Sequence, residues 1–338
     1  MAAAVNYPVK SPQWVLTYEN VNITADISSM VTALTYTDTL TGRAGAVEVA
    51  LEDHQRLWQG PWYPQQGDKV NLLIGYQGEE LLPCGDFEID ELELHGPPDQ
   101  FAIRGLAAWI TPAMRTRNNV GFEGQTLMEI ASTIAAKYNL TVVGAANALN
   151  PTFARITQHA ESDLAFLGRL ARDHGYNFTV RGNALVFYAM TSLEMAAPVL
   201  TLGRSDILSF SFINKTHLTY KAATVAYQYP QGKQLITQSS AGAGAGAASD
   251  TLKQATRCEN GQQATLKAES ALHEMNKTKI TLRASVPGAP SLSAGNVFAI
   301  GGFGAMDGNY LIETVRHRLT RERGYTSEVS ARQVISQS

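Results

Sequence analysis

Two stretches that lie far apart in the chain share one eight-residue pattern. Residues 85–92 and residues 308–315 both read glycine, any residue, aromatic, any residue, isoleucine, acid, any residue, aliphatic. The likeness continues upstream, where segment 67–70 has a counterpart in segment 295–297. A pattern that recurs together with its surroundings predicts two copies of one β-module. Chance likeness between two ordinary strand–turn–strand segments is the alternative.

The apolar residues of both stretches change phase at the same place. In the first copy they fall at Phe87 and Ile89 and next at Leu92, one position later than strict alternation requires. The second copy shows the same slip after Ile312. A β-bulge produces such a slip in an alternating strand, so we expect bulges near 90–91 and 313–314.

The repeat makes a prediction about structure. Segments 14–104 and about 206–333 should adopt the same topology and superpose as folded units. The expected equivalences are Phe87 with Tyr310 and Ile89 with Ile312.

Composition narrows the class of protein. The chain has 338 residues, enough for two or three domains, with 44% hydrophobic and 17% charged residues. Its net charge is −3 and it has no basic run, which gives no basis for nucleic-acid binding by phosphate neutralisation. The sequence contains neither a signal-peptide pattern nor an apolar run of the ~20 residues that would cross a bilayer. Cys84 and Cys258 are interpreted as small buried hydrophobic residues.

The middle of the chain changes from strand to helix patterns. Thr126 and Glu129 form a capping box before an apolar stripe that runs to Tyr138, and Asn139 suits a left-handed C-terminal position. A second helix is expected over 162–175, with Leu164, Leu167 and Ala171 on one face. A hairpin with a turn at 182–183 follows. We therefore predict a first β-module at 1–104 and a small α+β insertion at 105–200.

The last third returns to strands. Segments 207–213 and 219–229 read as strands, and a helix with small residues on one side is expected over 262–275. Residues 239–249 are Gly/Ala-rich and are expected to form a mobile loop that tolerates shortening. These elements make 201–338 the second β-module.

No constellation of catalytic residues stands out. His159, Glu161 and Asp163 form the densest polar cluster, which a loop ending in a helix N-cap explains. Segment 301–304 is glycine-rich but precedes a strand, so it predicts a turn and no phosphate site. Asp86, Glu88 and Asp90 read as a solvated or partner-facing strand surface. The seven histidines, which lack metal-ligand spacing, are His54, His95, His159, His174, His217, His273 and His317. We expect no catalytic residue, no cofactor and no metal.

A short segment has a second interpretation. Within 105–150, the run Gly124, Thr126 and Leu127, then Ile130 and later Tyr138-Asn139-Leu140, resembles the LysM peptidoglycan-binding pattern. The resemblance covers fewer than twenty residues. A cell-wall-binding module, and a cell-wall hydrolase with Glu161 and Asp163 at its site, therefore remain alternative functions.

Four stretches of the chain share a further resemblance. The first runs from Leu34 through the strand ending at Asp53, and the second is the Trp62-Tyr63-Pro64 link to Asp68. The third runs from Gln158 to Tyr176, and the fourth joins Gly302-Phe303 to Gly324-Tyr325-Thr326. In this order they resemble the phage late control protein D family, the baseplate hubs of contractile-tailed phages, which are related to the hub part of VgrG.

The resemblance implies a mainly β protein with an α+β insertion and two tail-tube-like β-barrel or sandwich modules in each chain. It implies a structural, non-enzymatic homotrimer that adapts the sixfold tail tube to the threefold spike. The implied partners are the tail tube protein, the spike protein, other baseplate proteins and the tape measure protein in the lumen. DNA would only pass through the channel, and no membrane partner is expected. The implied location is the virion baseplate, assembled in the host cytoplasm, with the hub separate from the spike.

Overall fold

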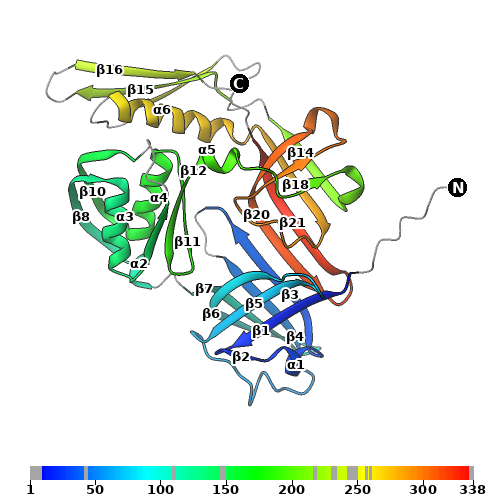
Figure 1. Cartoon of the computed structure of the whole chain (residues 1–338). Helices are drawn as coiled ribbons and strands as arrows, with labels where there is room; N and C mark the ends of the chain where they lie inside the picture. The colour runs from blue at the N-terminus through cyan, green and yellow to red at the C-terminus, as the bar shows by residue number, and fades with distance from the viewer. Residues whose placement is uncertain are drawn as a thin grey trace.

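The protein is mainly β, and one large sheet dominates it (Figure 1). The computed structural model describes residues 10–41, 45–108, 112–144, 150–215, 219–229, 234–241, 250–255, 258 and 261–334. The sheet has 13 strands and is antiparallel except where β13 pairs with β19. No helix within these residues is long and apolar enough to cross a membrane.

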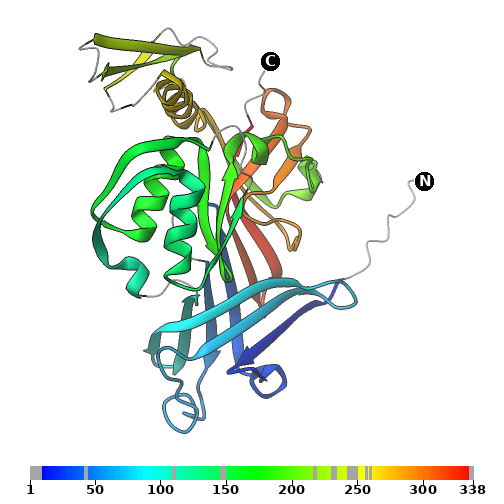
Figure 2. The same ribbon diagram turned by 60° about the vertical axis from the view of Figure 1, so that its left-hand side comes forward.

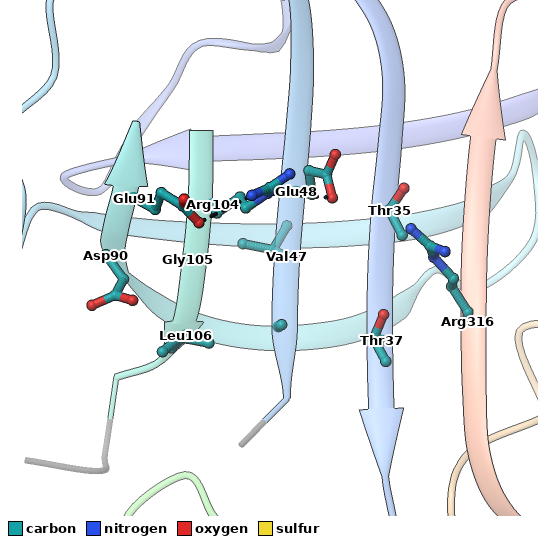
Figure 3. A pocket seen from close by; sticks show the side chains of 11 residues that line it. Thr35, Thr37, Val47, Glu48, Asp90, Glu91, Arg104, Gly105, Leu106 and Arg316 are labelled. Carbon is teal, nitrogen blue, oxygen red and sulfur yellow. Dashed lines mark hydrogen bonds and ion pairs between the residues drawn. The ribbon is translucent and has the colours of Figure 1, made fainter. Parts of the chain in front are cut away.

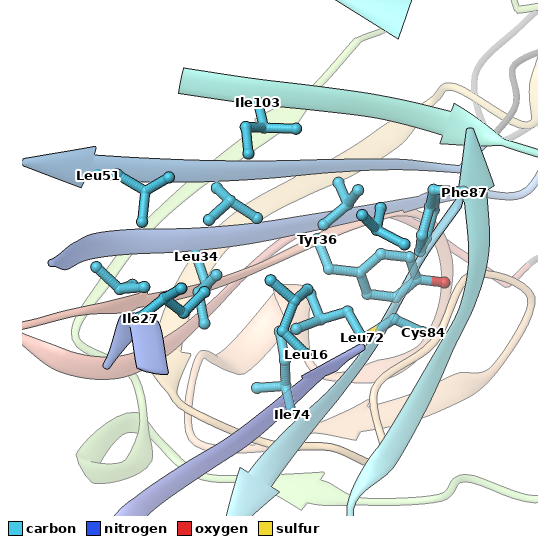
Figure 4. Packing of buried hydrophobic residues seen from close by; sticks show 14 of the residues in the cluster. Leu16, Ile27, Leu34, Tyr36, Leu51, Leu72, Ile74, Cys84, Phe87 and Ile103 are labelled. Atoms are coloured by element: carbon cyan, nitrogen blue, oxygen red, sulfur yellow. The ribbon is translucent and has the colours of Figure 1, made fainter. Parts of the chain in front are cut away.

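The first part of the chain supplies half of this sheet, in the order β3-β4-β7-β6-β5-β1-β2. Its elements are β1 (Pro12–Tyr18), β2 (Val21–Asn22), α1 (Thr24–Ile27), β3 (Val31–Thr39), β4 (Ala46–Glu52), β5 (Lys69–Tyr76), β6 (Leu82–His95) and β7 (Gln100–Ala107). Alternate residues of β4, namely Val47, Val49 and Leu51, are buried, as the sequence period predicts. They face a core that also contains Leu34 and Phe87 (Figure 4).

The last part of the chain repeats the same pairing order, as β14-β18-β21-β20-β19-β13. Its strands are β13 (Thr201–Leu202), β14 (Ser209–Asn214), β18 (Ile280–Pro287), β19 (Val297–Ile300), β20 (Gly308–Thr320) and β21 (Gly324–Gln333). The 3-10 helices η1 (Arg204–Asp206) and η2 (Gly304–Met306) lie in its loops. Read in chain order, β3, β4, β5, β6 and β7 correspond to β14, β18, β19, β20 and β21. The copies differ at one strand. β1 pairs with β5 in an antiparallel manner, whereas β13, at the corresponding place in the sheet, pairs with β19 in a parallel manner.

The predicted bulges are present in both copies. The register between β6 and β7 shifts between Ile89 and Glu91, and that between β20 and β21 shifts between Ile312 and Thr314. The backbone around each bulge is also alike. Gly67 donates its N–H to the Ile89 carbonyl at 2.8 Å, and Gly295 donates to the Ile312 carbonyl at 2.9 Å.

Residues 112–194 lie between the two halves in the sequence and contain a hydrophobic core of their own. Its elements are α2 (Pro112–Arg115), β8 (Arg117–Thr126), α3 (Leu127–Ala136), β9 (Thr141–Gly144), β10 (Thr152–Ser162), α4 (Asp163–Asp173), β11 (Tyr176–Arg181), β12 (Ala184–Ala189) and α5 (Met190–Glu194). The capping box at Thr126 and the left-handed φ of 54° at Asn139 are as predicted. The buried face of α4 is wider than expected, because Phe166 and Leu170 fill it while Leu164 is only partly buried.

A second, smaller unit interrupts the repeat between β14 and β18. The helix α6 (Gly261–Asn276) lies on the sheet β16-β15-β17 and packs Ala264 and Ala268 against it (Figure 1). The three strands are β15 (Ala222–Tyr229), β16 (Gln234–Ala241) and β17 (Thr251–Ala255). The predicted loop at 239–249 is wrong at its start, because residues 239–241 pair with β15. Residues 242–249 and His217 lie outside the described residues.

The two halves join without a break, which the sequence did not predict. The second half of β20 pairs with β3 from Thr314 opposite Thr39 to Thr320 opposite Ala33. Figures 1 and 2 show the blue strands of the first half beside the red strands of the second, with the green insertion to one side. The edge strand β3 of the first copy and the second half of β20 therefore join the two copies.

Candidate assembly interface

The strand β20 holds the two copies together through its two halves. Its first half pairs with β19, and its second half, after the bulge at Glu313, pairs with β3. The Leu40 N–H donates to the Glu313 carbonyl at 2.9 Å, at the point where β20 changes its partner from β19 to β3. A bulge twists a strand locally, which turns the second half of β20 away from β19 and toward β3.

The equivalent strand of the first copy lacks this second partner. Residues 82–88 of β6 pair with β5 on one side, and β7 occupies the other side as far as His95. Beyond the bulge, the edge of residues 91–95 that faces away from β7 has no strand partner among the described residues. An unpaired strand edge is a template for another strand.

The matching edge lies at the other end of the sheet. The strand β14, which corresponds to β3, pairs with β18 on one side and with no described strand on the other. Apolar side chains are exposed along it: Leu208 is 62% exposed, Phe210 41% and Ile213 44%. On the β6 edge, Leu94 is 52% exposed. Exposed apolar side chains beside unpaired backbone mark a contact surface.

The join inside the chain is specified by buried polar contacts. The Asp38 carboxylate accepts the Ala294 N–H at 2.9 Å and lies 3.3 Å from Arg181 Nη2. Burial raises the pKa of Asp38, while Arg181 and the Ala294 N–H oppose that rise. Asn177 adds a buried hydrogen bond of 2.9 Å to the Leu40 carbonyl. Because Arg181 and Asn177 belong to β11, the insertion contacts the join at the C-terminal end of β3.

A buried histidine sits in the same join. His317 of β20 donates from Nε2 to the Leu292 carbonyl at 2.9 Å, and its Nδ1 accepts from Tyr325 at 2.8 Å. Burial lowers the pKa of His317 to about 4, so the ring is neutral at physiological pH. It stacks on Tyr36 of β3 with ring centroids 6.0 Å apart, which links the two copies through side chains.

The sheet face opposite the cores is polar and bears a shallow hollow (Figure 3). Arg104 stands in its middle and donates to Glu91 at 3.0 Å and Glu93 at 2.5 Å. A hydrogen bond from His95, with the Arg104 charge, holds the pKa of Glu93 below its usual value. Arg316 of β20 and Thr35 of β3 line the other side of the hollow.

The polar cluster at 159–163 has a structural role in this geometry. Asp163 is fully buried and accepts hydrogen bonds from Gln158 at 2.7 Å and Tyr138 at 2.7 Å. Burial would raise the pKa of Asp163, but these bonds and Lys137 lower it. Glu161 is paired with Arg169 at 2.7 Å. Both carboxylates are therefore engaged by partners that keep them ionised, and the His159 backbone also contributes a hydrogen bond to Glu161.

The other sequence candidates are dispersed. Segment 301–304 forms a turn that leads into η2, and its Phe303 packs against Phe210. Cys84 and Cys258 are unbridged and buried in different cores. Burial raises the pKa of both thiols, which suits a packing role. Within the residues that the structure describes, no group of three or more potential metal ligands occurs.

Sequence reasoning did not locate the unpaired edge. Asp86, Glu88 and Asp90 were expected on a solvated or partner-facing strand surface, and the unpaired edge lies one bulge further along, at 91–95. The repeat was the signal that could have found it, because β20 shows what the equivalent edge of β6 is able to bind.

A family model described as "Phage tail baseplate hub (GPD)" matches residues 100–323 of the chain. The chain belongs to the phage tail baseplate hub family. The probable baseplate hub proteins of Escherichia phages 186 and P2 are 32% and 28% identical to this chain over 200 residues. Each alignment covers 58% of this chain and 51% of the relative, so the chain spans about half the length of these relatives.

Solved structures agree with this fold. The tail protein from Neisseria meningitidis MC58 has a TM-score of 0.72 at 13% identity, and the match covers 96% of this chain and 98% of the tail protein. The prophage MuSo2 43 kDa tail protein from Shewanella oneidensis has a TM-score of 0.71 at 15% identity, with the same coverage. A component of the E. coli type VI secretion system has a TM-score of 0.60 at 12% identity, and the match covers 91% of this chain and 74% of that component.

Proposed function

We propose that three copies of this hub protein close a ring in the baseplate of a contractile tail. In each chain, residues 1–104 and 201–338 act as two tail-tube-like modules, so that the ring contains six. Such a ring matches a sixfold tail tube on one side and a threefold spike on the other. Its role is structural, and the insertion at 105–200 lies outside the channel wall.

One observation carries this proposal. The strand-pairing order of the first copy recurs in the second, and the join between β20 and β3 has an unmade counterpart in the edges of β6 and β14. An interface between different edges of identical chains is head-to-tail and generates a ring when the rotation closes. Repeating the internal join between chains would pair the open edges of β6 and β14 all around the ring, while β2 and β13 keep one described strand partner each.

The repeat also supplies a register for the missing join. Carrying the β20–β3 register through the equivalences with β7, β21, β4 and β18 places His95 opposite Ser211 and Leu94 opposite Phe212. Leu94 would then be covered by an aromatic side chain, as His317 is by Tyr36 inside the chain.

The polar face of the sheet is proposed to line the channel. The opposite face carries the two cores, which leaves only this face to surround a lumen. The lumen would accommodate a tape measure protein and passing DNA, and the ends of the ring would contact tube, spike and other baseplate proteins.

A cross-link in the assembled tail tests the proposal. Chains that carry His95→Cys and Ser211→Cys should form disulfide-linked trimers, because opposite residues of paired strands place their Cβ atoms ~4.5–5.5 Å apart. Leu94→Cys with Ser211→Cys is the matched control, since these side chains point to opposite sheet faces. An image of the baseplate should show three chains per ring. A ring of six complete chains would overturn the proposal.

No structural observation favours a cell-wall-binding module. Leu127, Ile130 and Ala131 of the LysM-like pattern are buried in the core that they share with α4 and β12. The segment is thus part of a larger packed unit.

A further inference from the structure

The internal join carries opposite charges on its two sides. On the polar face, Arg318 of β20 is opposite Thr35 of β3, which is opposite Glu48 of β4. The small Thr35 side chain separates a basic residue on one side from an acidic residue on the other. At the lower end, Arg321 Nη1 lies 2.9 Å from Glu52 of β4. The β20 side of this join is therefore basic and the β3–β4 side acidic.

On the two unpaired edges the signs are exchanged at two positions: Glu93 replaces Arg316 and Arg283 replaces Glu48, while His95 takes the place of Arg318. The β6 edge presents Glu91 and Glu93 on the polar face, bridged by Arg104 behind them. Beside the β14 edge, the exposed Arg283 of β18 is opposite Ser211. Ser211 occupies the position of Thr35, and Arg283 that of Glu48. Lys215, which follows β14, is also exposed.

The exchange of signs changes which edges are compatible. An acidic β6 edge fits the basic β14–β18 edge of another copy, but it would repel a second β6 edge. Two β14 edges would likewise bring basic residues together. Like charges opposite each other on paired strands are destabilising, so edge-to-edge twofold dimers are disfavoured.

We infer that Glu93 and Arg283 are specificity residues that select a head-to-tail second copy of this chain as the partner of each edge and reject twofold pairing. This inference rests on the proposed ring, which uses the same two edges. The backbone ladder and the apolar side chains supply the contact, and the charges decide between arrangements that the ladder alone would permit. The strand positions support this assignment. In the register derived from the repeat, Glu93 is opposite Ile213 and diagonal to Ser211, and Ser211 is the residue opposite Arg283.

The test exchanges the charges and measures the rate at which a His95→Cys chain cross-links to a Ser211→Cys chain. Glu93→Lys in the first chain, or Arg283→Glu in the second, should each slow the reaction about tenfold at low salt, because an attraction becomes a repulsion. Combining both should restore most of the rate. Added salt should slow the wild-type reaction and speed that of either single swap.

Glu80→Lys is the matched control, because it makes the same charge change in an exposed turn at the opposite end of β6. It should leave the rate unchanged, and melting temperatures check that each variant is folded. Unchanged rates for both single swaps, with cross-linking intact, would overturn the charge selection while the ring stands. Absence of the cross-link between unswapped chains, in solution and in tails, would overturn the register and this inference together.

Discussion

The two copies of the β-module share one topology, yet equivalent positions have opposite environments. Leu94 of β6 is 52% exposed, whereas His317, at the same place in β20, is fully buried. Leu106 of β7 is 39% exposed, whereas its counterpart Arg332 in β21 is 0% exposed. A polar side chain is thus buried where the first copy exposes an apolar one. The burial of a residue here depends on what packs over its strand, because the strands themselves are equivalent.

The burial of Arg332 has an identifiable cause. Its guanidinium Nη2 lies 2.5 Å from a carboxylate oxygen of Glu194 in α5, and the two form an ion pair. Glu194 also accepts a hydrogen bond of 2.9 Å from His273 of α6. Burial would raise the pKa of Glu194, but His273 and the Arg332 charge hold it below its usual value. Glu194, through its contacts with Arg332 and His273, therefore links both inserted units to the second copy.

The largest effects are expected where the copies are alike. Phe87 and Tyr310 are equivalent and are 1% and 0% exposed. Replacing either with alanine should lower the free energy of unfolding by ~3–5 kcal/mol, because each leaves a large cavity. Chemical denaturation measures this. Tyr310→Phe is the control and should cost ~1 kcal/mol, since it removes only the hydrogen bond to Met306. A difference of several kcal/mol between the two alanine variants would argue against equivalent packing.

Glu194→Gln tests the burial of Arg332, which distinguishes β21 from β7. It should lower the free energy of unfolding by ~3 kcal/mol, because it leaves the Arg332 charge buried beside only the more distant Glu313. Glu274→Gln, on the exposed side of α6, should change stability by less than ~0.5 kcal/mol. Equal effects of the two substitutions would show that Arg332 is hydrated in solution.

The burial of His317, at the position of the exposed Leu94, can be tested through the pH dependence of stability. The pKa of His317 is about 4 in the folded chain and ~6.5 when unfolded, so the unfolded state binds more protons between these values. Stability should therefore be unaffected by this group above pH ~6.5 and fall by about 3 kcal/mol as the pH drops to ~4.

His317→Gln should flatten that part of the profile measured by denaturation at several pH values. A remaining slope belongs to the other groups whose pKa the fold lowers, namely His174 through burial and, at the acid end, carboxylates such as Glu194 and Asp163. An unchanged profile would mean that His317 is not the buried base described here.

The smallest effects are expected at the paired turns. Gly67 and Gly295 both have φ of 93°. Alanine at Gly67 should cost ~1–2 kcal/mol through backbone strain alone, since nothing lies within 4 Å of the added Cβ. At Gly295 the added Cβ would also meet Leu40 Cδ1 at 3.2 Å, so the loss should be larger. Thermal denaturation of the two variants compares the stability losses. A larger loss at Gly67 than at Gly295 would show that the surroundings of the two turns differ from this description.

The periodic features of the fold could be predicted from the sequence because they are local. The phase slip after Ile89 and Ile312 predicts each bulge, since a side chain can reach the core only on one face of a strand. The capping box at Thr126 predicts the start of α3 for a similarly local reason. The boundary at 239 was wrong because Gly/Ala composition does not prevent residues 239–241 from pairing with β15.

The sequence by itself determined that this chain contains two related, bulged β-segments, because alternation and glycine positions are written residue by residue. Only the tertiary structure decided that β20 joins β3, that Arg332 and His317 are buried, and that the edges of β6 and β14 lack described strand partners. The physical reason is that strand edges bond through backbone atoms, which are the same for every residue except proline. The choice of partner and the burial of each side chain thus depend on distant segments that no local pattern names.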